Sequence, residues 1–258
     1  MVEIMMRPIL TLFFISIILI IIIPTISAQK ELNCPHSINE VIIDGVWEES
    51  EWDDAEEIPL ISVYEDESVT GWVRIKNDES YFYAIIDFTS TPILVCGDGA
   101  AIIFDTEYNL GDKPQKDDFR FYFPCEGKPS MEIGTGYQFV WRDELPEGFI
   151  ADMSFGPSPH SNSPHPIYEF RMPLSIFPLD TNQVGFTANA WAIKIHGTRD
   201  DIFLAWPRNS DYKVPDTWGE MNFPYPVPEF FSFLITIIIA IVYSLFFLKN
   251  KNVTYSID

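Results

Sequence analysis

The residues best suited to bind a ligand are aromatic side chains in expected loops, because an aromatic face can stack on the C–H surface of a sugar. Tyr212 is the main candidate, with Arg208 and Asp211 beside it as polar groups. Trp141 and Trp72 are further candidate rings. The other tryptophans lie in or beside strand-like motifs and are expected in the core; they are Trp47, Trp52, Trp191, Trp206 and Trp218.

Carboxylates gather around one expected loop and suggest a calcium site, because calcium is bound by oxygen ligands that acidic loops supply. Asp98 and Asp105 lie at the two ends of an expected strand. The carboxylates that follow in the loop are Glu107, Asp112, Asp117 and Asp118. Their spacing matches no known calcium-loop motif, so a solvated acidic loop stays open as the alternative.

Haem and catalysis are not expected. Met131, Met153, Met172 and His196 form no pattern that would place two haem ligands on one face. His160 and His165 lie in a proline-rich stretch and lack a third metal ligand nearby in sequence. The chain contains no G-x-S-x-G, H-E-x-x-H, phosphate-binding glycine loop or C-x-x-C motif. Adjacent carboxylates such as Asp53 and Asp54 would point to opposite faces of a strand, which does not make an acid and base pair.

Three cysteines allow at most one internal disulfide. We expect Cys96 to pair with Cys125, because these two residues flank two expected neighbouring strands. Cys34 would then keep a free thiol.

Short β-type runs separated by turn residues must position these groups, and they predict a single all-β domain, an antiparallel sandwich or jelly roll. The turn clusters are residues 76–79 and residues 109–114, and the proline-rich residues 156–166 are expected to form a loop that cannot pair in a sheet. The expected strands are residues 41–43, 58–64, 69–76, 81–88, 100–105, 119–123, 136–141, 149–155, 167–172, 184–195, 202–206 and 219–223.

Two apolar stretches flank this domain. Residues 8–23, followed by a small-residue finish, predict a signal peptide cleaved after Ala28; an uncleaved anchor helix is the alternative. Residues 230–248 are uncharged and long enough to cross a hydrocarbon core of roughly 30 Å. Lysines follow at once, which predicts an external domain over residues 29–223, a Pro-rich spacer over 224–229 and a cytoplasmic tail over 249–258.

The second stretch begins with Pro228, Glu229 and Phe230, which resemble the archaeal PEF-type C-terminal sorting signals. That resemblance implies an archaeal cell-surface protein whose tail is cut by a sortase-like enzyme. A plain single-pass anchor is the alternative.

The chain is strongly acidic, with 16 Lys and Arg against 38 Asp and Glu and a formal net charge of −22. Phosphate backbones would repel such a chain, so nucleic acid is excluded as a partner. The charge suits a soluble exported domain that meets neutral or basic partners.

Five sequence pieces, in order, resemble the family 9 carbohydrate-binding modules and the wider set of DOMON-like β-sandwiches. The first, residues 42–55, reads I-I-D-G-V-W-E-E-S-E-W-D-D-A and resembles the opening motif. The others, each similar to a strand or closing element of the family, are residues 73–83, 98–105, 168–174 and 205–221. The resemblance covers about residues 40–223 and implies the sandwich fold; calcium is common in such modules.

In the sugar-binding members two aromatic residues grip the terminal sugar unit. One precedes the strand at 98–105, where this chain has Val95, Cys96 and Gly97 and therefore lacks the ring. The other lies between the last two motifs, where Tyr212 is the aromatic residue. The reading is a non-catalytic, membrane-tethered module for a polysaccharide or cell-surface glycan. The alternatives are a ligand-free cell-envelope interaction domain and a haem-binding redox module.

Overall fold

The computed structural model describes residues 30–63, 69–125, 127–178, 181–198 and 200–223. The chain divides into two compact units, residues 1–30 and 31–258, and only Lys30 of the first unit is among the described residues. The expected signal peptide, spacer, apolar span and tail therefore lie outside the described residues. Within the described part, no helix has the length and apolar character needed to cross a bilayer.

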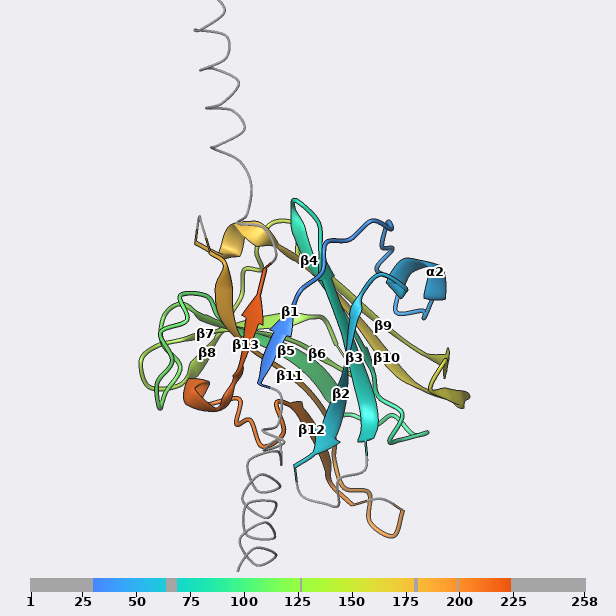
Figure 1. Cartoon of the computed structure of the whole chain (residues 1–258). Coiled ribbons are helices and arrows are strands. Elements are labelled where there is room, and N and C mark those ends of the chain that lie inside the picture. Colours follow the sequence, from blue (N-terminus) through green and yellow to red (C-terminus); the bar gives the residue numbers. More distant parts are fainter. Residues whose placement is uncertain (1–29, 64–68, 126, 179–180, 199, 224–258) are drawn as a thin grey trace, which may run out of the picture. The chain divides into compact units, whose positions relative to one another are not determined.

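The described part of the second unit is an all-β fold (Figure 1). Its strands are β1 (Glu31–Asn33), β2 (Glu56–Ser62), β3 (Val69–Asn77), β4 (Tyr81–Asp87), β5 (Gly99–Asp105), β6 (Asp118–Pro124), β7 (Ser130–Gly134), β8 (Phe139–Arg142), β9 (Ile150–Ser158), β10 (Ser161–Pro173), β11 (Gln183–Ala192), β12 (Ile202–Trp206) and β13 (Gly219–Asn222). One short helix, α2 (Glu49–Trp52), and two 3₁₀ turns, η1 (Leu174–Ile176) and η2 (Pro215–Thr217), complete it.

The strands form one hydrogen-bonded path in the order β8-β7-β6-β5-β11-β12-β2-β3-β4-β10-β9. The link between β12 and β2 is short, with two register pairs, Leu204 with Ser62 and Ala205 with Ile61. Strand β13 pairs antiparallel with β11 and parallel with β1. The other pairs along the path are antiparallel, as the sequence predicts.

The path folds over so that two layers enclose one core. Phe82 of β4 packs edge-on against Phe104 of β5, with ring centroids 5.3 Å apart, and also contacts Phe186 of β11. Because side chains alternate along a strand, every second residue faces this core. Burial of apolar side chains such as these rings favours folding of the sandwich. The predicted all-β sandwich is confirmed.

The outer face of the layer made by β3, β4 and β10 is covered by residues 37–55. Trp52 is fully buried there, against Tyr83, Ile85 and Ile167. Its indole Nε1–H donates to a carboxylate oxygen of Glu169 at 3.1 Å. Glu169 also accepts the backbone N–H groups of Asp44 and Gly45. We call this outer face, with its covering segment, the covered face.

The structure corrects the predicted elements in two places. Residues 41–43 form no strand, because they belong to the irregular segment that covers β4. Residues 156–166, predicted as a loop that cannot pair, instead extend β9 and β10 into a hairpin in which Ser161 pairs with Ser158 and His165 with Gly156. A shift of register between Ser161 and His165 accommodates the prolines. Strands β1 and β7 were not predicted.

Candidate functional site

A groove of about 680 Å³ opens on the outer face of the layer made by β5, β6 and β11. Its floor and walls come from β6, β11, β12, the loop before β12 and the segment before η2. The lining residues are Arg120, Asn189, Trp191, Ala192, Ile193, Lys194, Asp200, Asp201, Ile202, Phe203 and Tyr212. We call it the aromatic groove.

Strand β11 places the largest ring of the aromatic groove. Its residues alternate, with Ala188 and Ala190 facing the core and Asn189 and Trp191 facing outward. The Trp191 indole Nε1–H donates to the carbonyl oxygen of Gly97 at 2.7 Å, which fixes the plane of the ring.

Gly99 gives the Trp191 ring its space over β5. A Cβ atom at Gly99 would lie 2.7 Å from Cζ2 of Trp191 and 2.8 Å from the carbonyl oxygen of Phe123. Both distances are shorter than a van der Waals contact, so any side chain at position 99 would displace the ring or the backbone beside it. Trp191, predicted to lie in the core, is therefore half-buried and faces the groove.

Arg120 of β6 lies among three aromatic rings. Its guanidinium carbon is 4.7 Å from the ring centroid of Tyr212, 4.8 Å from that of Tyr122 and 5.5 Å from that of Trp191. One terminal nitrogen donates to Glu132 of β7 at 2.7 Å. Attraction between a cation and aromatic faces, together with this ion pair, holds the side chain in one place.

Two polar atoms of the groove residues are buried without a hydrogen-bond partner among the described residues. They are Nε of Arg120, a donor, and Oδ1 of Asn189, an acceptor. A buried polar group that lacks a partner costs free energy. A ligand that brings hydroxyl groups can donate to one atom and accept from the other, so the pair is suited to a polyhydroxylated molecule.

Tyr212 is held at the edge of the groove by the turn that precedes η2. The carbonyl oxygen of Asp211 accepts the indole Nε1–H of Trp218 at 2.8 Å, and the Asp211 N–H donates to the Thr217 hydroxyl at 2.8 Å. The ammonium group of Lys213 lies 4.9 Å from the Tyr212 ring centroid. Tyr212, the main candidate from the sequence, therefore lies at the groove.

Charged groups line the rim of the groove. Lys194 Nζ donates to Asp200 Oδ1 at 2.6 Å, and the Lys194 backbone N–H donates to Asp201 at 2.6 Å. The hydrogen bond between the Lys194 ammonium and the Asp200 carboxylate raises the pKa of Lys194 and lowers that of Asp200. Both groups keep their charges near neutral pH.

The other candidate ligand residues lie elsewhere. Arg208 and Asp211 are close to Tyr212 in sequence but do not line the groove. Trp141, on the edge strand β8, has 53% of its surface exposed. Trp72 lies on β3 of the other layer, where its ring stacks on His160. The structure thus brings Tyr212 together with Arg120, Asn189 and Trp191. These last three residues were not predicted to bind a ligand.

The sequence contains a signal that could have identified Asn189 and Trp191 as groove residues. Residues 186–192 read F-T-A-N-A-W-A, in which small or apolar residues alternate with Thr187, Asn189 and Trp191. A tryptophan in register with a threonine and an asparagine faces the polar side of a strand. That alternation places Trp191 outside the core.

Three of the six predicted calcium ligands come together at the end of β5 and the start of β6. Carboxylate oxygens of Asp105, Asp117 and Asp118 all lie within 4.8 Å of one another. Asp105 and Asp118 are fully buried. Burial raises the pKa of Asp105, and burial raises the pKa of Asp118 to about 8, to which the neighbouring carboxylates contribute.

Backbone and side-chain donors satisfy part of this acidic cluster. Asp105 accepts the N–H groups of Asn109 and Leu110, and Asp118 Oδ2 accepts that of Gln115 at 2.6 Å. Asp118 Oδ1 is buried and has no partner among the described residues. Carboxylate oxygens with one unpaired buried atom fit a hard divalent cation such as calcium.

The other predicted calcium ligands are not part of the cluster. Asp98, at the opposite end of β5, accepts the N–H groups of Val95 and Ile193 and shapes the loop beside the groove. Glu107 and Asp112 are exposed in the loop.

Cys96 is exposed and Cys125 is half-buried. The Cys125 thiol donates to the carbonyl oxygen of Val95 at 2.6 Å. The disulfide stays a prediction. Cys34 is fully buried, and burial raises the pKa of its thiol.

The methionines considered as haem ligands serve other roles where the structure describes them. Met131 and Met172 are buried in the hydrophobic core, and Met153 packs against it. His196 lies exposed in the loop between β11 and β12.

Comparisons with known proteins give one kind of match. No protein-family model matches the sequence. No curated protein matches it either. The fold is similar to two solved structures of a family 9 carbohydrate-binding module from Caldicellulosiruptor kristjanssonii. The complex with cellotriose gives a TM-score of 0.55 at 15% identity, over 75% of this chain and 93% of that one. The complex with glucose gives 0.56 at 14% identity, over 78% of this chain and 98% of that one. The chain therefore shares the fold of these modules.

Proposed function

We propose that this domain is a non-catalytic saccharide-binding module whose ligand lies in the aromatic groove. The observation that carries the proposal is the unpaired donor and acceptor pair, Arg120 Nε and Asn189 Oδ1, beside the rings of Trp191 and Tyr212. A sugar-binding site needs aromatic rings that stack on the C–H face of the sugar. It also needs a few well-placed polar atoms that bond to the hydroxyl groups. The similarity of the fold to modules solved with cellotriose and glucose supports the same choice.

A neutral glycan suits this groove better than an anionic one. The chain carries a formal net charge of −22, which disfavours approach of a polyanion. Arg120 is already paired with Glu132, and Lys194 with Asp200, so neither cation is left to balance a carboxylate on the ligand.

Calorimetric titration of the purified protein with cellotriose, and with a panel of other neutral oligosaccharides, tests the proposal. Saturable binding is expected for at least one of them. Trp191→Ala and Tyr212→Ala should each weaken it at least about tenfold, about 1.4 kcal/mol. The control Tyr137→Ala changes a ring that is 70% exposed outside the groove and should bind as the unaltered protein does. Unchanged affinity in both groove variants would reject this site.

We propose in addition that Asp105, Asp117 and Asp118 hold a calcium ion. Bound there, the ion would supply positive charge among carboxylates that otherwise repel one another, and so join the loop after β5 to the start of β6. Thermal unfolding with calcium and with chelator tests this. Calcium should raise the Tm of the unaltered protein and of Asp112→Asn, which changes an exposed residue of the same loop, but should have little effect on Asp118→Asn. A Tm that ignores calcium would reject the site.

Export and membrane attachment are proposed from the sequence alone. We propose that the domain is exported, that cleavage follows Ala28, and that residues 230–248 hold the protein in the membrane until or unless a sortase-like enzyme cuts near Pro228. Mass spectrometry of the protein from membrane fractions of the source cells would give both termini. A chain that still begins at Met1 would reject the signal peptide.

A further inference from the structure

The hairpin between β9 and β10 ends in a tip, residues 157–164, that has few backbone donors of its own. Pro157, Pro159 and Pro164 lack an N–H group. The hydrogen bonds within the tip are local, as when the Ser163 N–H donates to the Ser161 hydroxyl at 3.2 Å. The tip must therefore be held on the sheet by side chains.

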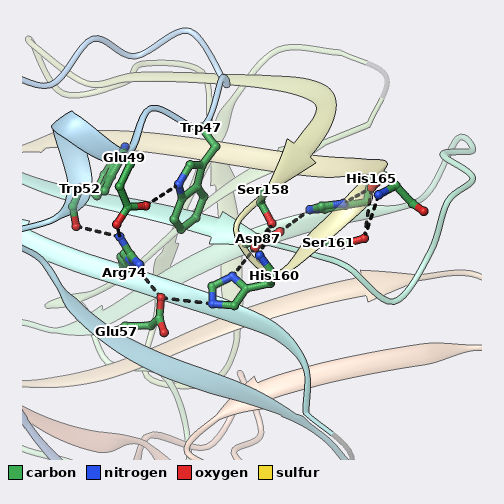
Figure 2. A network of polar contacts seen from close by, with 11 residues as sticks. Trp47, Glu49, Trp52, Glu57, Arg74, Asp87, Ser158, His160, Ser161 and His165 are labelled. Atoms are coloured by element: carbon green, nitrogen blue, oxygen red, sulfur yellow. Dashed lines mark hydrogen bonds and ion pairs between the residues drawn. The ribbon is translucent and has the colours of Figure 1, made fainter.

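Three side chains of the hairpin converge on one carboxylate, that of Asp87 at the end of β4 (Figure 2). The Ser158 hydroxyl donates to Asp87 Oδ2 at 2.7 Å, and His160 Nδ1 lies 2.7 Å from the same oxygen. His165 Nε2 contacts Asp87 Oδ1. Asp87 is fully buried, and His165 is 1% exposed.

The partners of His165 fix its protonation state. His165 Nδ1 lies 2.7 Å from the carbonyl oxygen of Ser163 and its Nε2 faces Asp87. His160 Nδ1 also faces Asp87, and its Nε2 lies 3.3 Å from Glu57 Oε2. A carbonyl or carboxylate oxygen accepts hydrogen bonds and cannot donate. Both nitrogens of the His165 ring must therefore carry a proton, so this side chain is an imidazolium ion.

The tip covers an aromatic ring. His160 stacks on Trp72 of β3, with ring centroids 3.8 Å apart and planes 5° from parallel, and the edge of Trp47 completes the contact. Besides Asp87, three charged groups of the described residues lie beside this contact: Glu57, which faces His160, Arg74, which donates to Glu57 at 2.7 Å, and Glu49, which accepts from Arg74 at 3.3 Å. Figure 2 shows Arg74 and Glu57 linking the tip to α2.

We propose that residues 157–164 are a proton-controlled latch, closed over Trp72 while His165 is an imidazolium ion and released when this ring loses a proton. A neutral imidazole has one N–H. Loss of one proton therefore replaces a hydrogen bond with a nitrogen lone pair that faces an oxygen lone pair, which is repulsive. The anchors on Asp87 then fail together, and the tip leaves Trp72. The device is independent of saccharide binding in the aromatic groove.

The direction of the pH dependence follows from the two buried groups. Burial alone would lower the pKa of His165, but hydrogen bonds to Asp87 and to the Ser163 carbonyl raise it above its ordinary value. Burial alone would raise the pKa of Asp87, but hydrogen bonds from His165, Ser158 and His160 lower it. The latch is closed between these two pKa values. It opens as the pH rises through the raised pKa of His165.

Nitrogen NMR of the histidine rings in the full chain tests the latch. At about pH 7.5, where an ordinary histidine of pKa about 6.5 is mostly neutral, the His165 ring should still be doubly protonated. On further increase of pH, the ring signals of His160 should lose the upfield shift caused by stacking on Trp72. The amide signals of Ser161 and Ser163 should move in the same step.

Variants separate the latch from a general effect of pH. His165→Gln keeps a side-chain donor for Asp87 but has no titrating ring, so the concerted step should disappear while His160 stays on Trp72. Ser158→Ala removes one anchor and should shift the step to lower pH without unfolding the domain. His196→Gln, in the loop before β12, is the matched control and should leave the step unchanged. The proposal would be overturned by a neutral His165 ring at about pH 7.5, or by amide signals of the tip that do not shift as His165 titrates.

Discussion

The outer faces of the two layers each place an arginine among aromatic rings, but the two arginines differ in how many of their hydrogen-bonding groups have a partner. On the covered face, Arg74 lies 4.8 Å from the Trp47 ring and donates to Glu57, to Glu49 and to the Trp52 carbonyl. In the aromatic groove, Arg120 lies among three rings, yet its Nε has no partner among the described residues. An arginine among aromatic rings therefore does not identify a binding site by itself. Hydrogen-bonding capacity that the protein leaves unused does.

The largest expected effect is on the covered face. Trp52→Ala removes a fully buried ring and leaves Glu169 without its indole donor, so we expect a loss of about 3–5 kcal/mol in the free energy of unfolding. Denaturant unfolding measures it. Saccharide affinity of the folded protein should not change. A small loss of stability would mean that residues 37–55 contribute little to the core.

A matched pair of substitutions makes the contrast sharper. Arg74→Lys breaks hydrogen bonds to several acceptors at once and should cost about 1–3 kcal/mol of stability with unchanged binding. Arg120→Lys keeps the charge beside Glu132 but loses Nε, and should weaken saccharide binding about tenfold with little effect on unfolding. Calorimetric titration and denaturant unfolding of both variants give the four values. If both substitutions change stability and saccharide affinity to the same extent, the two faces do not differ in function.

The two faces should also differ in their response to pH. Burial raises the pKa of Glu169 to about 7. The native state then keeps a proton that the unfolded chain releases near pH 4, so stability should fall by at least about 1 kcal/mol as the pH rises from about 5 to about 7. Glu169→Gln should reduce that loss, as followed by unfolding at several pH values. Saccharide binding should stay constant over this range, because Lys194 and Asp200 keep their charges.

The smallest effect is expected for Trp141→Ala. This ring is half exposed on an edge strand outside both faces, so stability should change by less than about 0.5 kcal/mol. Affinity for the saccharide should stay the same. A loss of affinity would extend the ligand beyond the aromatic groove to β8.

The sequence predicts the layers well and the groove in part. Strands such as β4 and β5 are strongly apolar runs next to recognisable turns, so their positions follow from local pattern. Tyr212 was found because it lies in a loop. Arg120 was not, because its meaning depends on three rings from separate parts of the chain. The proline-rich tip was misread as an unpaired loop, because its hold on the sheet depends on Asp87, which is more than 70 positions away.

The missing side chain at Gly99 has a consequence for how this protein can change over generations. Its hydrogen atom occupies the space that keeps the Trp191 ring flat over β5, and one methyl group there would meet both the ring and the Phe123 carbonyl. Gly99→Ala would therefore displace the Trp191 ring while changing the identity of no residue that lines the groove. A lineage that keeps the fold but abandons the ligand has a one-residue route to do so, and related chains with a larger residue at position 99 are expected to have lost or changed what they bind.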